Sequence, residues 1–90
     1  MNMLELRHAH KEEIKSLINR RRVEREILSL RHQGRMEQSM LIIADPVERS
    51  CALIKNAKEM TSFTYKYLKE WEVMLARHII ETDALAKKLL

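Results

Sequence analysis

The chain has 90 residues, room for one domain, and its 17 basic and 13 acidic residues give a net charge of +4. It has one glycine, one proline and few aromatic residues, with abundant leucine, isoleucine, alanine, methionine, glutamate, lysine and arginine, which is typical of long helices. Architectures built from strands and tight turns are therefore excluded, and the mild positive charge permits an acidic partner without requiring one.

Cysteine usage and hydropathy predict a protein of the reducing cytoplasm. Cys51 is the one cysteine, so no internal disulfide can form, and the N-terminal residues lack the apolar core of a signal peptide. The longest apolar run, Met40 to Ala44, has five residues, whereas about 20 are needed to cross a bilayer. We expect a cytoplasmic protein without membrane or cofactor partners.

The first helix is predicted over residues 3–43. This range contains no proline, and its one glycine is Gly34, which costs about 1 kcal/mol relative to alanine inside a helix. Gly34 could instead end a helix in the left-handed conformation that follows many helix C-termini. One long helix is the prediction that we favour.

Apolar side chains of this helix fall on two faces, which predicts contact with two neighbours. Between these faces, residues 19–26 are almost entirely charged. The first face consists of Ile14, Leu17, Ile18 and Leu28, and the second, about a third of a turn away, of Val23, Ile27 and Leu30.

The charged segment is a candidate anion site through Arg21, Arg22 and Arg25, because guanidinium groups suit phosphate and carboxylate recognition. Some small dimeric regulators bind RNA through charged residues on one face of a four-helix bundle. No aromatic residue of the first helix could stack on bases. Charge runs of this kind most often form an ordinary solvated, salt-bridged face, and that interpretation ranks first, ahead of a contact with an acidic protein and of anion binding.

The turn is predicted at Asp45-Pro46. The Asp45 side chain can accept a hydrogen bond from the first helical amides, Pro46 suits the first helical position, and Glu48 can reach back to the Asp45 amide. A second helix is therefore predicted over residues 46–89. Ser62 could begin a third helix near residues 61–63, and this alternative stays open.

The second helix carries an apolar row with a seven-residue repeat, typical of a coiled coil. A second row to its side makes the apolar stripe wider than one facing helix needs, which favours a bundle of more than two helices. The first row is Val47, Ile54, Thr61, Leu68, Leu75, Thr82 and Leu89, accompanied by Ala57, Trp71, His78 and Leu85, and the second is Leu53, Met60, Tyr67 and Met74.

Metal binding is considered at His8, His10, His78 and Glu81, because a hairpin that turns near residue 45 brings both ends of the chain together. His8 and His10 lie on different helix faces, and too few inward carboxylates accompany them. A packed His78 and surface positions for the other histidines are expected, and no metal is predicted.

No catalytic residue is predicted from spacing. Cys51 lies five residues after Pro46 at a spacing where a buried, small apolar cysteine is expected. The serines lack the glycines of a nucleophile elbow, and no glycine-rich loop could hold phosphates.

Two segments resemble small all-helical chorismate mutases, which have a similar second-helix start and an Ile-Ile-Glu segment in the last helix. The segments are Asp45-Pro46-Val47-Glu48-Arg49 and Ile79-Ile80-Glu81. The order Glu48-Arg49 is reversed relative to that family, the expected lysine is missing from the first helix, and Lys87 stands where glutamine or glutamate is wanted. A chorismate-mutase-like enzyme is the third hypothesis.

The leading hypothesis is an all-α helical hairpin that acts as a small interaction module, as an adaptor, chaperone or structural subunit. It would self-associate or bind a helical protein through the wide apolar face of the second helix, at Leu68, Trp71, Leu75 and Ile79. A basic hairpin that binds RNA or another polyanion is the second hypothesis.

Overall fold

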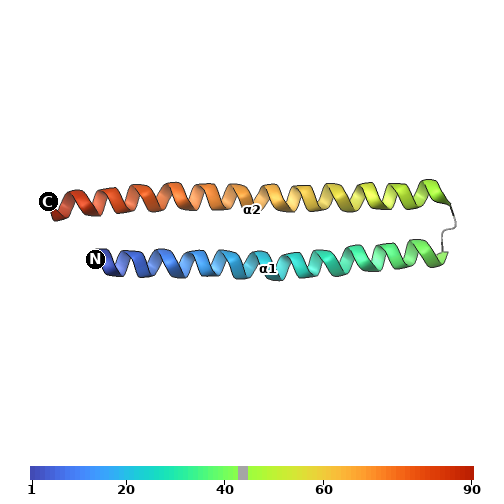
Figure 1. The fold of residues 1–90 in the computed structure, drawn as a ribbon, viewed down its shortest axis with the longest axis horizontal. Coiled ribbons are helices and arrows are strands. Elements are labelled where there is room, and N and C mark those ends of the chain that lie inside the picture. Colours follow the sequence, from blue (N-terminus) through green and yellow to red (C-terminus); the bar gives the residue numbers. More distant parts are fainter. Residues whose placement is uncertain (43–44) are drawn as a thin grey trace. The chain divides into compact units, whose positions relative to one another are not determined.

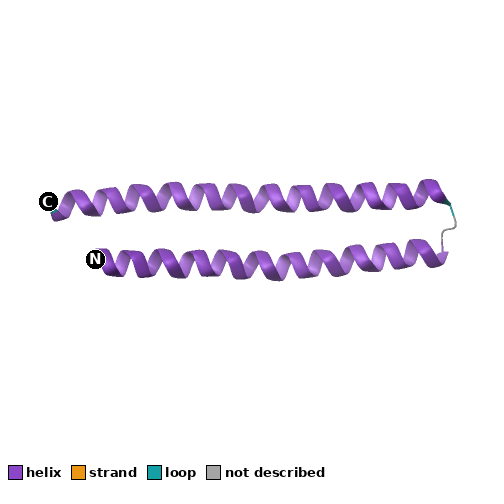
Figure 2. Cartoon of the chain, in the orientation of Figure 1, coloured by secondary structure: helices purple, strands orange, loops and turns teal. Residues whose placement is uncertain are grey.

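The structure, a computed structural model, describes the backbone of residues 1–42 and 45–90 and the side chains of residues 1–38 and 45–90. It contains helix α1 (Met3–Ile42) and helix α2 (Pro46–Leu89) (Figure 1). No described residue lies in a strand (Figure 2). The prediction of an all-α hairpin is confirmed, and residue 43, the predicted end of the first helix, lies outside the described residues.

Short polar side chains cap the N-termini of both helices. The Val47 amide donates to Oδ1 of Asp45 at 3.0 Å, as the sequence predicts. At the other cap, the Glu5 amide donates to Oδ1 of Asn2 at 2.8 Å, and the Asn2 side chain donates to Glu5 Oε1 at 3.0 Å. Amides that lack a partner within the helix are thus satisfied at both starts.

Helix α2 continues through residues 61–64, so the chain has two helices in its described part and Ser62 does not begin a third. The hydroxyl of Thr61 donates to the Ala57 carbonyl at 3.0 Å, and that of Thr64 donates to the Met60 carbonyl at 2.9 Å. Bonds to the preceding turn let threonine stay inside a helix despite its poor helical propensity.

The chain forms two compact units. The terminal unit consists of Met1–Arg21 and Tyr67–Leu90, and the turn unit is Arg22–Lys66. Within each unit a segment of α1 runs antiparallel to a segment of α2, as the side-chain pairs show. His10 bonds Glu81 and Arg20 bonds Glu70 in the terminal unit, whereas Glu24 bonds Lys66 and His32 bonds Glu59 in the turn unit.

Burial differs between the two units. The terminal unit buries Leu6, Leu17, Tyr67, Met74 and the polar His78. No described side chain of the turn unit is buried to that extent, and five of its half-buried residues are polar. Half-buried side chains of the turn unit include the polar Glu24, His32, Arg35, Asn56 and Glu59 and the apolar Leu28, Met36, Met60 and Phe63. The turn unit therefore has a thin and partly polar interior.

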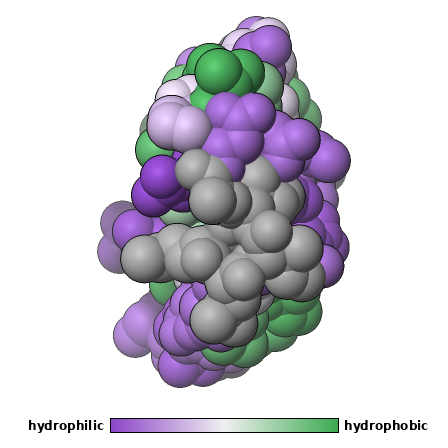
Figure 3. Space-filling model, turned by 90° about the vertical axis from the view of Figure 1, so that its right-hand side faces the viewer, coloured by the Kyte–Doolittle hydropathy of each residue, from purple (hydrophilic) through white to green (hydrophobic). Residues whose placement is uncertain are grey.

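The predicted heptad row of α2 is not the row that packs on α1. Its large members Val47, Ile54, Leu68, Leu75 and Leu89 are exposed, whereas Tyr67 and Met74 of the second row are buried. Glu70 and Arg77, which flank this second row, make ion pairs with α1. Seen from the turn end, hydrophobic and hydrophilic surface is interspersed (Figure 3).

The expectation that Cys51 is buried is wrong, because this side chain is exposed. Cys51 lies five residues before the half-buried Asn56, which places it about 140° around the helix. The five-residue spacing from Pro46 therefore did not identify the face of α2 that packs on α1.

Gly34 lies inside α1 and does not end it, since its φ is not positive and a Cβ there would meet nothing within 4 Å. We expect Gly34→Ala to raise the free energy of unfolding by about 0.5–1 kcal/mol, because alanine loses less backbone entropy on folding. Urea titration followed by circular dichroism, at one fixed protein concentration, measures this change. An alanine variant that is less stable than the unmodified protein would contradict the position of Gly34 inside a continuous helix α1.

The Asp45 cap is tested by Asp45→Ala, which should lower the free energy of unfolding by about 1 kcal/mol because the Val47 amide loses its acceptor. The Asp45→Asn variant keeps a side-chain oxygen and serves as the control in the same titration. Equal losses in both variants would show that charge, rather than the hydrogen bond, matters at this position.

Candidate functional site

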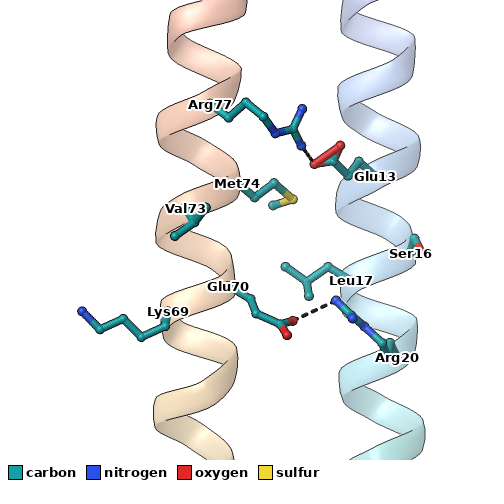
Figure 4. A pocket seen from close by; sticks show the side chains of 9 residues that line it. All are labelled: Glu13, Ser16, Leu17, Arg20, Lys69, Glu70, Val73, Met74 and Arg77. Carbon is teal, nitrogen blue, oxygen red and sulfur yellow. Dashed lines mark hydrogen bonds and ion pairs between the residues drawn. The ribbon is translucent and has the colours of Figure 1, made fainter.

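The terminal unit holds the predicted partner-binding residues and the histidine cluster. Leu17 of α1 and Met74 of α2 point toward each other across the contact, and both are buried (Figure 4). Position i−1 and position i+1 lie on opposite flanks of a helical residue, each about 100° away. Leu17 and Met74 therefore divide the surface of this unit into two flanks.

Ion pairs dominate one flank. Arg20 contacts Glu70 at 2.8 Å, and Arg77 pairs with Glu13 (Figure 4). These residues line a groove of about 440 Å³ together with Ser16 and Val73, which precede Leu17 and Met74 in the chain. Four of the charged side chains of this groove are paired across the two helices, and the fifth, Lys69, pairs with Glu72 of α2 at 3.9 Å. This flank therefore offers little unpaired charge to a ligand.

The opposite flank is apolar. Ile18 and Leu75 follow Leu17 and Met74, so both lie on the flank away from the groove. Leu68 and Ile79 share the face of Leu75, because they lie seven residues before and four residues after it. We name this surface the apolar face, and its side chains are exposed by 53% at Ile18, 53% at Leu68, 37% at Leu75 and 63% at Ile79.

The structure thus brings three of the four predicted partner-binding residues to one exposed surface. Trp71, the fourth, is half-buried between the apolar face and the row that packs on α1. Ile18, expected from the sequence to share a face with Leu17, instead lies at the exposed edge. A shallow pocket of about 310 Å³ borders Leu75 and Ile79, and His78 lines its inner side.

Two histidines stack at the interior of the same unit. The rings of His10 and His78 lie 3.8 Å apart between centroids, with an angle of 13° between their planes. His10 Nε2 lies 2.8 Å from Glu81 Oε2, and His78 Nε2 lies 3.3 Å from Glu13 Oε1. Both histidines were candidates from the sequence, whereas Glu13 was not, and only the antiparallel register reveals it.

The cluster favours neutral His78 and ionised Glu81. Burial, followed by the charges of His10 and Arg77, lowers the pKa of His78 below its ordinary value, although Glu81 opposes this shift. Hydrogen bonds from His10 and then Arg77 lower the pKa of Glu81. Likewise, His32 and Arg35 in the turn unit lower the pKa of Glu59, His32 most strongly.

No group of three or more histidine, cysteine or acidic side chains in the described part of the chain is arranged to hold a metal ion. His8, the fourth candidate ligand, is exposed. Glu81 is occupied by hydrogen bonds to His10 and Arg77. The contacts of His10 with Glu81 and of His78 with Glu13 join the two helices of this unit.

The predicted anion-binding arginines are all exposed: Arg21 in the terminal unit, and Arg22 and Arg25 in the turn unit. Their neighbour Arg20 contacts Glu70, and its guanidinium carbon lies 5.8 Å from the centre of the Tyr67 ring. That contact occupies one member of the arginine run. Anion binding by the other three stays a prediction.

Two acidic side chains of the segments that resemble chorismate mutases make a capping contact and interhelical or intrahelical hydrogen bonds. Asp45 caps α2 in the turn unit, and Glu81 bonds His10 and Arg77 in the terminal unit. Comparison with protein-family models, with curated proteins and with solved structures finds no match. Among the described residues, neither helix has a stretch long and apolar enough to span a membrane.

We expect the fold to lose stability as the pH falls from 7 to 4. A histidine with a lowered pKa binds fewer protons when folded, so unfolding is favoured as the pH drops below the ordinary value of 6.5. Glu59 and Glu81 stabilise the fold above their ordinary value of 4.5, and this stabilisation disappears as they are protonated. All three groups act in the same direction.

Urea titrations at several pH values measure this dependence. His78→Gln should flatten it between pH 7 and 5, whereas His8→Gln, at an exposed histidine outside the cluster, should leave it unchanged. A stability that is constant or rises toward pH 4 in the unmodified protein would contradict the account of the cluster.

Proposed function

We propose that the protein is a small helical interaction module that self-associates through the apolar face. The observation that carries this proposal is the contrast between the two flanks of the terminal unit. One flank satisfies its charged groups with ion pairs, and the other exposes Ile18, Leu68, Leu75 and Ile79 side by side. A cluster of large apolar side chains on one surface is typical of an interface.

The length of the chain and the free energy gained by burying apolar side chains both support binding of a second molecule to the apolar face. A 90-residue chain buries only about 60–65% of its unfolded surface, which leaves a lone helix pair marginally stable. Burying one leucine or isoleucine fully contributes about 1.5–3 kcal/mol. A second copy of the chain placed on the apolar face would create a four-helix bundle. In a symmetric dimer, these side chains would be buried in both subunits.

Adaptor, chaperone or structural roles all fit a module of this kind. Trp71, which the sequence predicts as a partner-binding residue, is half-buried and lies beside Leu68 and Leu75 on the helix surface. It therefore borders the apolar face on the side toward α1. Its indole would be covered completely only when a partner is bound. Residues 68–79 of α2 would therefore supply most of the interface.

The double variant Leu75→Glu/Ile79→Glu tests the proposal. We expect the unmodified protein to be a dimer or larger by light scattering, and the variant to be a helical monomer. Two carboxylates from each subunit of a symmetric interface should weaken association by about 100-fold, because each subunit loses apolar burial and must desolvate charge.

Val73→Glu is the matched control. Val73 is 68% exposed and lies on the flank with the ion pairs, so its replacement should leave the oligomeric state unchanged. An unmodified protein that remains monomeric over the whole concentration range, or a control that dissociates as readily as the double variant, would refute self-association through the apolar face.

A further inference from the structure

The turn unit contains a second surface, independent of the apolar face. A groove of about 600 Å³ runs between the segments of α1 and α2 in this unit. We name it the basic groove. The residues that define it are Ile27, Leu28 and Phe63 as its apolar lining and Arg31, Lys55 and Lys58 as its cationic rim.

The cations of the rim lack acidic partners. The two glutamates that also line the groove are used elsewhere, since Glu24 bonds Lys66 at 3.2 Å and Glu59 bonds His32 and Arg35 at 3.0 and 3.1 Å. In the described part of the chain, which contains all 13 acidic residues, no ion pair involves Arg31, Lys55 or Lys58. Three positive charges therefore surround the groove without neutralisation.

Apolar side chains continue from the groove along α1. Ile27 is 54% exposed within the groove, and Val23 and Leu30 lie four residues before and three residues after it, both exposed. This spacing forms one stripe on the helix surface. The sequence assigns the same three residues to a second face that should meet a neighbour, and in the structure all three are exposed, by 48% at Val23, 54% at Ile27 and 68% at Leu30.

We propose that the basic groove binds an acidic amphipathic helix of a partner protein. The partner's apolar side chains would pack on Ile27 and the adjoining Val23–Leu30 stripe, and its carboxylates would pair with Arg31, Lys55 and Lys58. From Lys55 to Lys66 the groove accompanies α2 for about 16 Å, which corresponds to about three helical turns of the partner.

The chemistry of the groove favours a peptide over a nucleic acid. A phosphate backbone carries charge at every nucleotide, whereas the lining offers exposed isoleucine between the cations and includes two carboxylates. Phe63, the aromatic ring of the lining, is half-buried and so presents little of its face for base stacking. An amphipathic helix can place leucine at Ile27 and glutamate at the rim.

A synthetic fluorescein-labelled helix of about 18 residues, with one row of leucine and glutamate elsewhere, is the probe. Fluorescence anisotropy with the full chain at about 50 mM salt measures binding, which should weaken as salt rises. Peptides with lysine in place of glutamate, or serine in place of leucine, should bind at least about tenfold more weakly.

The variant Lys55→Glu/Lys58→Glu should weaken binding of the acidic peptide by at least about tenfold. Lys87→Glu/Lys88→Glu changes the net charge equally at exposed residues of the terminal unit and should not weaken it. Ile27→Ser tests the apolar contact separately, and circular dichroism checks that each variant keeps its helices.

Several results would overturn the proposal: no binding of the acidic peptide, equal losses in both lysine double variants, or tighter binding of an RNA duplex through Lys55 and Lys58. A changed oligomeric state of the Lys55→Glu/Lys58→Glu variant by light scattering would also overturn it, because the groove would then hold a second copy of the chain. The proposal does not rest on self-association, so either can fail alone.

Discussion

Two packed helices cover only a narrow strip of each other's surface. Apolar side chains outside this strip therefore stay exposed within the helix pair. In the terminal unit the strip is filled by Leu6, Leu17, Tyr67, Met74 and His78. Helix α2 carries a wider apolar stripe than this strip can cover. Leu68, Leu75 and Ile79 are consequently left exposed, and the self-association that we propose would bury them.

Polar contacts fix which residues of α1 lie opposite which residues of α2. In the turn unit His32, Arg35, Asn56 and Glu59 form hydrogen bonds across the contact, where apolar residues alone would tolerate sliding. A shift along the helix axis by one turn would separate each of these groups from its partner and leave half-buried charges unpaired. The polar interior of the turn unit thus favours one register of the two helices. The larger apolar contacts of the terminal unit contribute most of the buried surface.

Local signals predict the helices well, and long-range pairing explains what the sequence leaves undetermined. The Asp45 cap and the uninterrupted helices follow from side chains that act within one turn. The rotation of α2 does not, because the rows of Met74 and Leu75 are both apolar, and the contacts that identify the row facing α1, such as Glu13 with Arg77, join residues 64 apart in the chain. Lys55 and Lys58 gave no sequence signal, since isolated lysines are ordinary on a helix surface.

The central claim is that this helix pair is completed by association, which couples stability to protein concentration. The most direct measurement is the thermal midpoint, Tm, followed by circular dichroism over about a 100-fold range of concentration. Self-association through the apolar face predicts a Tm that rises by about 5–10 °C over this range. A Tm that is independent of concentration would contradict the account.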